Sequence, residues 1–163
     1  MAGDPIPLPI LAPISGTLVP LDQVPDPVFS QRMLGDGLAI DPAAGAVVAP
    51  AAGQIAALYP TGHALGLRTP GGCEILIHLG IDTARLEGVF RPRVQQGETV
   101  RAGQPLIDVD LERLRALARS PLVPVIVTRL PAGRPVTLPL APGTPVRGGV
   151  DAILVVGPGR EDA

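Results

Sequence analysis

Glycine and proline interrupt this chain throughout its length and leave little room for long helices. There are 20 glycines and 21 prolines among 163 residues, and they separate short apolar runs such as 16–19, 46–49 and 53–59. Both residue types mark turns, and proline cannot continue a helix. Because they alternate with apolar runs, the pattern indicates many short strands joined by turns, and therefore an all-β sandwich or barrel.

One short helix is expected in this all-β chain. Asp110 can cap a helix over 110–119, in which Leu111, Leu114 and Leu117 share one face. The segment 28–34 is expected to be one helical turn or an ordered loop. The pattern Ala-Pro-x-x-Gly-x-apolar-x occurs at both 12–19 and 49–56, which is a faint indication of duplicated halves.

The length and composition are those of one domain with an aliphatic core. Apolar residues make up 46% of the chain, yet only Phe29, Tyr59 and Phe90 are aromatic. The chain is long enough to bury a core of Val, Ile, Leu and Ala. We expect residues 1–10 to form a flexible arm, 11–157 to form a single domain, and 158–163 to form a polar tail.

Charge and cysteine content argue against several classes of protein. The net charge is −2, lysine is absent, and aromatic residues are too few for a nucleic-acid interface. A single cysteine excludes an internal disulfide framework and fits a reducing compartment. No stretch approaches the length of a membrane span, so no membrane insertion is expected. We expect a cytoplasmic protein that needs no cofactor.

Residues 72–83 read as a strand that ends in a histidine. Ile75 and Ile77 would face a core, and Leu76 and His78 the opposite side, because strand side chains alternate between faces. His63, the only other histidine, lies in the run 63–69 that would pair with it. A two-residue loop at 70–71 or a four-residue loop at 70–73 would place both histidines on one face, whereas three residues would separate them. The shared face therefore requires an even loop.

Two neighbouring imidazoles suit phosphoryl transfer. A neutral imidazole nitrogen can act as a nucleophile near pH 7. Thr61 can orient His63, and Asp82 can supply an acidic rim. Phosphoryl transfer requires mainly alignment and charge stabilisation, so His78 is the expected acceptor and His63 a hydrogen-bond donor to the phosphoryl oxygens.

Several separated motifs resemble one known family. They are Ala12-Pro13-x-Ser15-Gly16, Val24-Pro25-Asp26-x-Val28-Phe29, Gly35-Asp36-Gly37-x-Ala39-Ile40, Val48-Ala49-Pro50-x-x-Gly53, Thr61-x-His63-Ala64, Gly72-x-x-Ile75-Leu76-Ile77-His78-Leu79-Gly80-Ile81-x-Thr83 and Gly97-x-x-Val100. Over about residues 10–130 the chain is similar to the glucose-type enzyme IIA domains of the phosphoenolpyruvate-dependent sugar phosphotransferase system.

The resemblance implies a fold, partners and roles for individual residues. The fold would be a duplicated hybrid β-sandwich, and the protein a monomer. His78 would take a phosphoryl group from the phosphocarrier protein HPr and pass it to a sugar-specific IIB domain, with His63 in support and Thr61 bonded to His63. Asp26 and Asp82 would meet an arginine of the partner. The apolar docking ring would consist of Val28, Phe29, Met33 and Leu76.

Two other classes of function are alternatives. A regulatory β-domain could act through protein contacts alone. A zinc peptidase of the lysostaphin type would need a second histidine at position 76 or 80, where the chain has Leu76 and Gly80. His63 and His78 could at most form an adventitious or partner-completed zinc site.

Overall fold

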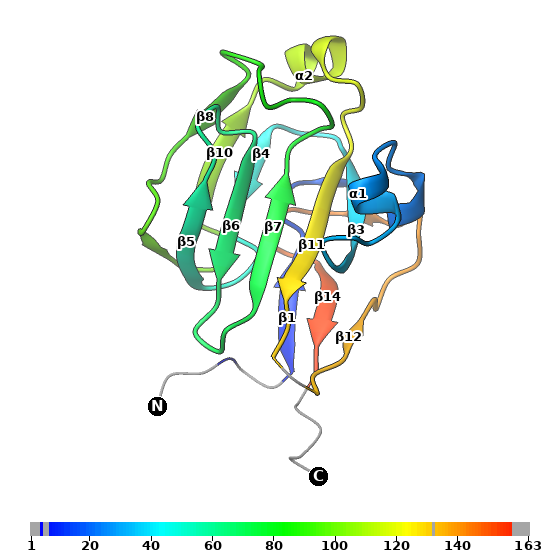
Figure 1. Cartoon of the computed structure of the whole chain (residues 1–163), viewed down its shortest axis with the longest axis vertical. Helices are drawn as coiled ribbons and strands as arrows, with labels where there is room; N and C mark the ends of the chain where they lie inside the picture. The colour runs from blue at the N-terminus through cyan, green and yellow to red at the C-terminus, as the bar shows by residue number, and fades with distance from the viewer. Residues whose placement is uncertain (1–3, 5–6, 132, 158–163) are drawn as a thin grey trace.

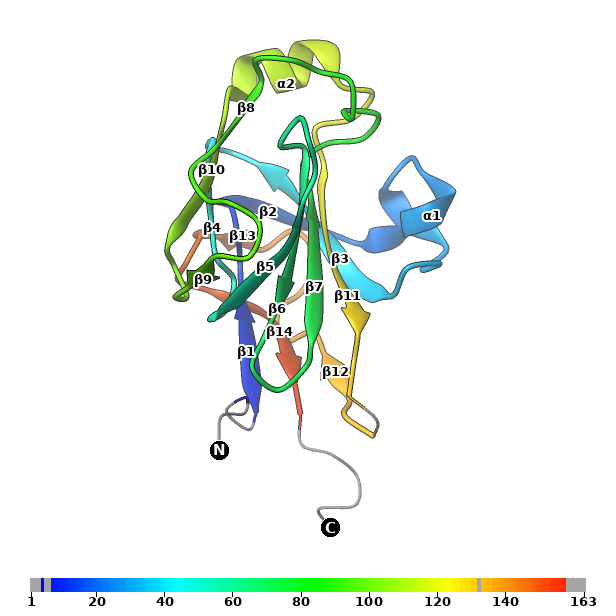
Figure 2. The ribbon, with the colours of Figure 1, turned by 60° about the vertical axis from the view of Figure 1, so that its left-hand side comes forward.

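A large antiparallel sheet and two smaller sheets make up the described part of the molecule (Figure 1). The computed structural model describes residues 4, 7–131 and 133–157. The large sheet has the order β13-β2-β3-β11-β7-β6-β5-β9, and the smaller sheets have the orders β4-β10-β8 and β1-β14-β12. Figure 2 shows β4, β8 and β10 as a second layer beside the large sheet. The all-β sandwich prediction is therefore confirmed.

The strands are short, as the spacing of Gly and Pro predicts. They are β1 (Leu8–Leu11), β2 (Gly16–Val19), β3 (Asp36–Pro42), β4 (Ala46–Val48), β5 (Gly53–Leu58), β6 (Ala64–Arg68), β7 (Glu74–His78), β8 (Phe90–Pro92), β9 (Thr99–Val100), β10 (Pro105–Val109), β11 (Val123–Arg129), β12 (Val136–Thr137), β13 (Pro145–Val146) and β14 (Ala152–Val156). Between the layers lies an aliphatic core that draws on residues from Leu8 to Val156.

The expected helix forms, together with one short helical turn. Helix α2 (Leu111–Leu117) is the expected helix, and the Asp110 carboxylate accepts from Arg113 N at 3.1 Å as its N-cap. A second helix, α1 (Pro27–Ser30), follows the 3₁₀ turn η1 (Leu21–Gln23). This α1 turn is the first of the two alternatives expected for 28–34, and it forms because Pro27 suits the first helical position and Asp26 caps it.

The repeated Ala-Pro-x-x-Gly pattern marks equivalent contacts in two halves. Strand β2 pairs Gly16 with Val146 of β13, and β5 pairs Gly53 with Val100 of β9. Each valine opens a Val-Arg-x-Gly turn whose glycine amide donates to the carbonyl of the repeat's alanine at 2.8 Å. These matching contacts support a duplicated architecture.

The predicted flexible arm ends earlier than residue 10. Residues 8–10 belong to β1, which pairs with β14, and both Leu8 and Ile10 are buried in the core. The prediction was wrong there because these two side chains alternate inward despite the surrounding prolines. Asp4 is also ordered, since it accepts from Thr69 Oγ1 at 2.8 Å. The rest of the arm (1–3 and 5–6) and the predicted tail (158–163) lie outside the described residues.

The β6–β7 hairpin has the register that was expected to separate the histidines. Arg68 pairs with Glu74 and Ala64 with His78, and Thr69 N donates to Cys73 O at 2.8 Å. The loop is therefore the three residues 70–72, and the expectation that a loop of this length would separate the histidines was wrong. Both imidazoles nevertheless lie together, because His63 precedes the first residue of β6.

None of the helices formed by the described residues is long and apolar enough to cross a membrane.

Candidate functional site

Two histidine rings meet where β7 ends, at the opposite end of the hairpin from its loop. The ring centroids of His63 and His78 are 5.3 Å apart, and the ring planes are inclined by 78°. In β7 the side chains of Ile75 and Ile77 are buried, whereas Leu76 and His78 are partly exposed on the other face. The predicted division of β7 into two faces is thus confirmed, and it presents His78 outward.

His63 reaches this face because it precedes the regular part of β6. It lies in the turn after Gly62, whose φ of +80° is a left-handed conformation that favours glycine. Leu79 N still donates to His63 O at 2.7 Å, so the backbone stays attached to the strand. The side chain, outside the strand, does not obey the strand's alternation, and its ring turns towards His78.

A backbone carbonyl fixes the tautomer of His78. His78 Nδ1 lies 2.7 Å from Gly80 O, and since a carbonyl can only accept, Nδ1 carries the proton. In the neutral ring Nε2 therefore holds the lone pair. Gly80 has a φ of +78°, and a Cβ there would lie 2.8 Å from atoms of Leu114 and Thr83. The glycine is what allows the carbonyl to take this position.

Thr61 fixes His63 in a similar way. Its Oγ1 donates to Ala84 O at 3.0 Å and lies 2.7 Å from His63 Nδ1. A hydroxyl has one proton to donate, so while it is given to Ala84 the hydroxyl accepts from Nδ1–H. The predicted contact between Thr61 and His63 is confirmed. Both imidazoles thus have Nδ1 engaged and Nε2 as the acceptor nitrogen.

Burial keeps both imidazoles neutral near pH 7. Desolvation lowers the pKa of His63, and the neighbouring His78 lowers it further. Desolvation also lowers the pKa of His78, although the bond to Gly80 and the charges of Asp26 and Asp82 oppose this. A neutral ring retains the lone pair that a nucleophile requires.

A shallow hollow of about 250 Å³ opens in front of the rings. Its lining consists of Asp26, Val28, Phe29, Leu34, Tyr59, His63, Ala64, Leu76 and His78. Leu34, Tyr59 and Ala64 were missed from sequence. Tyr59 had a signal, since it is one of three aromatic residues and stands two positions before Thr61. Its ring contacts His63 edge-on at 5.5 Å.

Phe29, which was expected in the apolar docking ring, lines the hollow but is almost completely buried. Only 4% of it is exposed, because α1 packs it against the small cluster that includes Leu21 and Ile126. Its ring lies 5.2 Å from that of His78 and forms part of the wall of the hollow. Val28 and Met33 are exposed as expected, but Met33 does not line the hollow.

The two predicted acids occupy different positions. Asp26 lines the hollow, and its Oδ1 accepts from Val28 N at 3.0 Å. The Asp82 carboxylate lies outside the lining and 3.7 Å from Arg119 Nη1. Both act on His78 through their charges, which raise its proton affinity.

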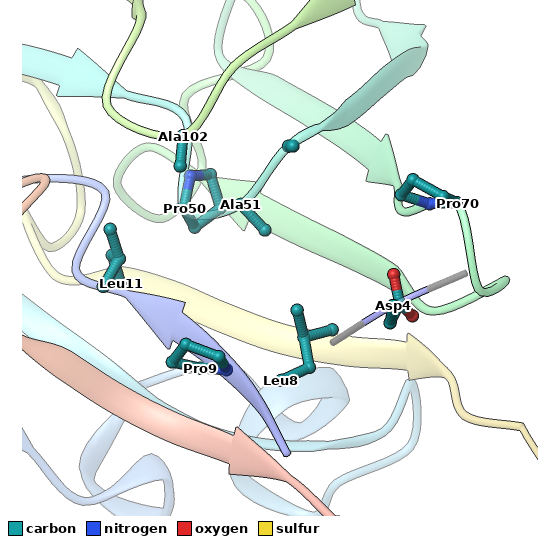
Figure 3. Close-up of a pocket in the computed structure, with 9 residues that line it drawn as sticks. Asp4, Leu8, Pro9, Leu11, Pro50, Ala51, Pro70 and Ala102 are labelled. Atoms are coloured by element: carbon teal, nitrogen blue, oxygen red, sulfur yellow. The ribbon is translucent and has the colours of Figure 1, made fainter. Parts of the chain in front are cut away.

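A second hollow, of about 310 Å³, shares no lining residue with the histidine hollow and is drawn in Figure 3. Its walls include Leu8 and Leu11 of β1, together with Pro50 and Pro70, and Asp4 is its one charged lining residue. Its size exceeds that of the histidine hollow, but it offers no nucleophile. Across the described parts of the chain, no group of three or more His, Cys, Asp or Glu could hold a metal ion.

The fold and the motifs agree with comparisons to known proteins. The profile of the family described as "phosphoenolpyruvate-dependent sugar phosphotransferase system, EIIA 1" matches residues 8–132. The PTS system glucose-specific EIIA component of Halalkalibacterium halodurans is 50% identical over 122 residues, 74% of this chain and 70% of that protein. The component of the same name from Bacillus cereus is 46% identical over 124 residues, 76% of this chain and 75% of that protein.

A solved structure extends the likeness over nearly the whole chain. The glucose permease IIA from Mycoplasma capricolum matches with a TM-score of 0.84 at 38% identity, covering 95% of this chain and 99% of that one. The resemblance noted in the motifs is thereby confirmed. This chain belongs to the glucose-type enzyme IIA family, a phosphocarrier family of the phosphoenolpyruvate-dependent sugar phosphotransferase system.

Proposed function

We propose that Nε2 of His78 accepts a phosphoryl group from phosphorylated HPr and passes it to a sugar-specific IIB domain. The observation that carries this proposal is the bond between His78 Nδ1 and Gly80 O, which leaves the lone pair on Nε2 of a ring that lines the hollow. The lone pair forms a new nitrogen–phosphorus bond while the bond between phosphorus and the donor's side chain breaks. Onward transfer repeats the exchange with the IIB side chain as acceptor.

His63 supports the transfer by donating to the phosphoryl oxygens. Its Nδ1 is held by Thr61, so donation through Nε2 requires either a second proton on the ring or reversal of the Thr61 hydroxyl. The negative phosphoryl group favours the first, because a nearby negative charge raises the proton affinity of an imidazole. The rings of Phe29 and Tyr59 limit water around the phosphohistidine.

The rim of the hollow suits protein partners with a basic, apolar docking face. Val28, Leu34 and Leu76 supply the apolar contacts, and Met33 extends them at the margin. Asp26 and Asp82 supply negative charge for an arginine of the partner. The relatives are named glucose-specific, so we propose glucose or a similar sugar as the transported substrate and the cytoplasm as the compartment.

Incubation with phosphoenolpyruvate, enzyme I and HPr tests this function. Wild type should gain one phosphate that is labile to acid and stable to base, and mass spectrometry should place it on His78. His78→Ala should gain none while unfolding at a similar temperature. If neither protein is labelled, the chain acts by protein contacts alone, which is the regulatory alternative.

A further inference from the structure

A trough continues from the histidine hollow along the outer face of the large sheet. A hollow of about 310 Å³ lies over β5, β6, β7 and β11, and it shares Leu34, Tyr59 and Leu76 with the histidine hollow. The residues that line its base include two with small side chains or none, Ala57 of β5 and Gly66 of β6. Any protein that reaches His78 therefore also faces this trough.

Three charged side chains lie in a row at the far end of the trough: Arg68 and Glu74 line it, and Arg129 follows the lining residue Thr128. Arg68 of β6 and Arg129 of β11 both pair with Glu74 of β7, which lies between them. The Glu74 carboxylate is 3.1 Å from Arg68 Nη2 and 3.8 Å from Arg129 Nη1. Two guanidinium groups share one carboxylate, so this end of the trough carries a surplus positive charge.

Both arginines can still bind another group. The side chains of Arg68 and Arg129 are 52% and 73% exposed, whereas that of Glu74 is 27% exposed. Each guanidinium has five N–H donors, more than one shared carboxylate can accept. The far end is therefore built to receive a carboxylate, while Asp26 and the charge of Asp82 favour a basic group at the histidine end.

We infer that this trough selects the phosphoryl donor through an acidic residue on the donor's docking face. The inference rests on the proposed function. Glu74 and His78 are four residues apart on one face of β7, so the donor's carboxylate would lie about 13 Å from its phosphoryl group. The donor is the partner favoured here, because it arrives with a phosphoryl charge of about −1.5 to −2 that the surplus positive charge attracts.

The test measures transfer from phosphorylated HPr at several HPr concentrations. Arg68→Ala combined with Arg129→Ala should raise KM about fivefold, leave kcat unchanged and make KM less dependent on salt. Glu74→Gln should change KM in the opposite direction, because it removes the carboxylate that partly neutralises the arginines. An unchanged KM in the double variant, or a raised KM in Glu74→Gln, would overturn the inference.

A matched control separates this site from a general effect of charge. Arg101→Ala combined with Arg147→Ala removes the same charge from two exposed turns outside the trough, and KM should stay near the wild-type value. An equal rise in KM in this control would also overturn the inference. If wild type accepts no phosphate at all, the proposed function fails. If wild type accepts phosphate and the two double variants have the same KM, only the role of the trough fails.

Discussion

The two ends of the β6–β7 hairpin use polar side chains in opposite ways. At the loop end, Asp4 accepts from Thr69 Oγ1 and Gly71 N and lies 3.6 Å from Arg134 Nη1. At the other end, His63 and His78 each have one nitrogen engaged and a second that is an acceptor beside a hollow. At the loop end the Asp4 carboxylate is fully engaged in holding the fold together, although Arg134 Nη2 is buried without a hydrogen-bond partner among the described residues. At the histidine end each ring keeps a free acceptor nitrogen beside a hollow, where it is available for chemistry.

The size of a hollow does not distinguish these two ends. The apolar hollow beside Asp4 measures about 310 Å³ and the histidine hollow about 250 Å³. The difference that matters is the lining, since only the smaller hollow combines a nucleophile, a hydrogen-bonding neighbour and an acid. Substitutions at the histidine end should therefore reduce phosphoryl transfer, and substitutions at the loop end should reduce the free energy of unfolding.

The largest effect is expected at the histidine end, in His63→Ala. The variant should still accept phosphate on His78, but its transfer to a IIB domain should fall about 100-fold, because a positioned hydrogen-bond donor to the phosphoryl oxygens is lost. Rapid-quench measurement of onward transfer checks this. His63→Gln, whose amide can donate, should recover part of the rate. Equal transfer by His63→Ala and wild type would remove the assigned role.

At the loop end, Asp4→Ala should lower the free energy of unfolding without changing phosphate acceptance. The side chains of Asp4 and Arg134 are 1% and 9% exposed, so loss of the carboxylate leaves a buried guanidinium without its partner. We expect a loss of about 3 kcal/mol in urea unfolding, with phosphate acceptance by the folded protein unchanged. Loss of acceptance in folded Asp4→Ala would erase the distinction between the two ends.

Asp108→Ala is the matched control for Asp4→Ala. Asp108 pairs with Arg93 at 2.7 Å, but both side chains are about half exposed. An exposed pair contributes little, so the change in unfolding free energy should stay within about 1 kcal/mol. Similar losses in the two variants would show that burial of the Asp4 pair has no special effect.

Sequence reasoning identified the chemistry of the site better than its geometry. Alternation along 74–78 predicted which side of β7 carries His78, and Asp110 predicted where α2 begins. The register of the hairpin was not predictable, because Pro70-Gly71-Gly72 permits loops of several lengths. The sequence also did not show that His63 would lie in a turn before β6, which is the reason that the two rings meet.

Tertiary packing accounts for the other errors. The resemblance placed Phe29 in an apolar docking ring, but α1 folds back and buries most of its side chain beside His78. Leu34 and Tyr59 are separated from His78 along the chain, and only the folded sheet brings them to one hollow. Leu8 was assigned to an arm because no local pattern shows that β14 will pair with it.

The smallest expected effect is a pH dependence that belongs to the histidine end alone. Burial lowers the pKa of both histidines below the ordinary value of 6.5. As pH falls below 6.5 the unfolded chain takes up protons that the folded rings do not, so the unfolding free energy should decrease until the folded pKa values are passed. Phosphate acceptance should decline only at a lower pH than for an ordinary imidazole, since the lowered pKa delays protonation of Nε2 of His78.

Urea unfolding at pH 7.5 and pH 5.5 measures this dependence. The double variant His63→Gln with His78→Gln should lose less stability between the two pH values than wild type does. Asp4→Ala should keep the wild-type dependence, because its site is at the other end of the hairpin. Equal pH dependence in wild type and the histidine double variant would contradict the assigned pKa shifts.

The most direct test of the account is the identity of the phosphorylated atom. NMR of protein labelled with ¹⁵N in its histidines, after incubation with phosphoenolpyruvate, enzyme I and HPr, should show phosphate on Nε2 of His78 and a retained proton on Nδ1. Phosphate on Nδ1 of His78, or on His63, would contradict the role assigned to the Gly80 carbonyl and with it the proposed mechanism.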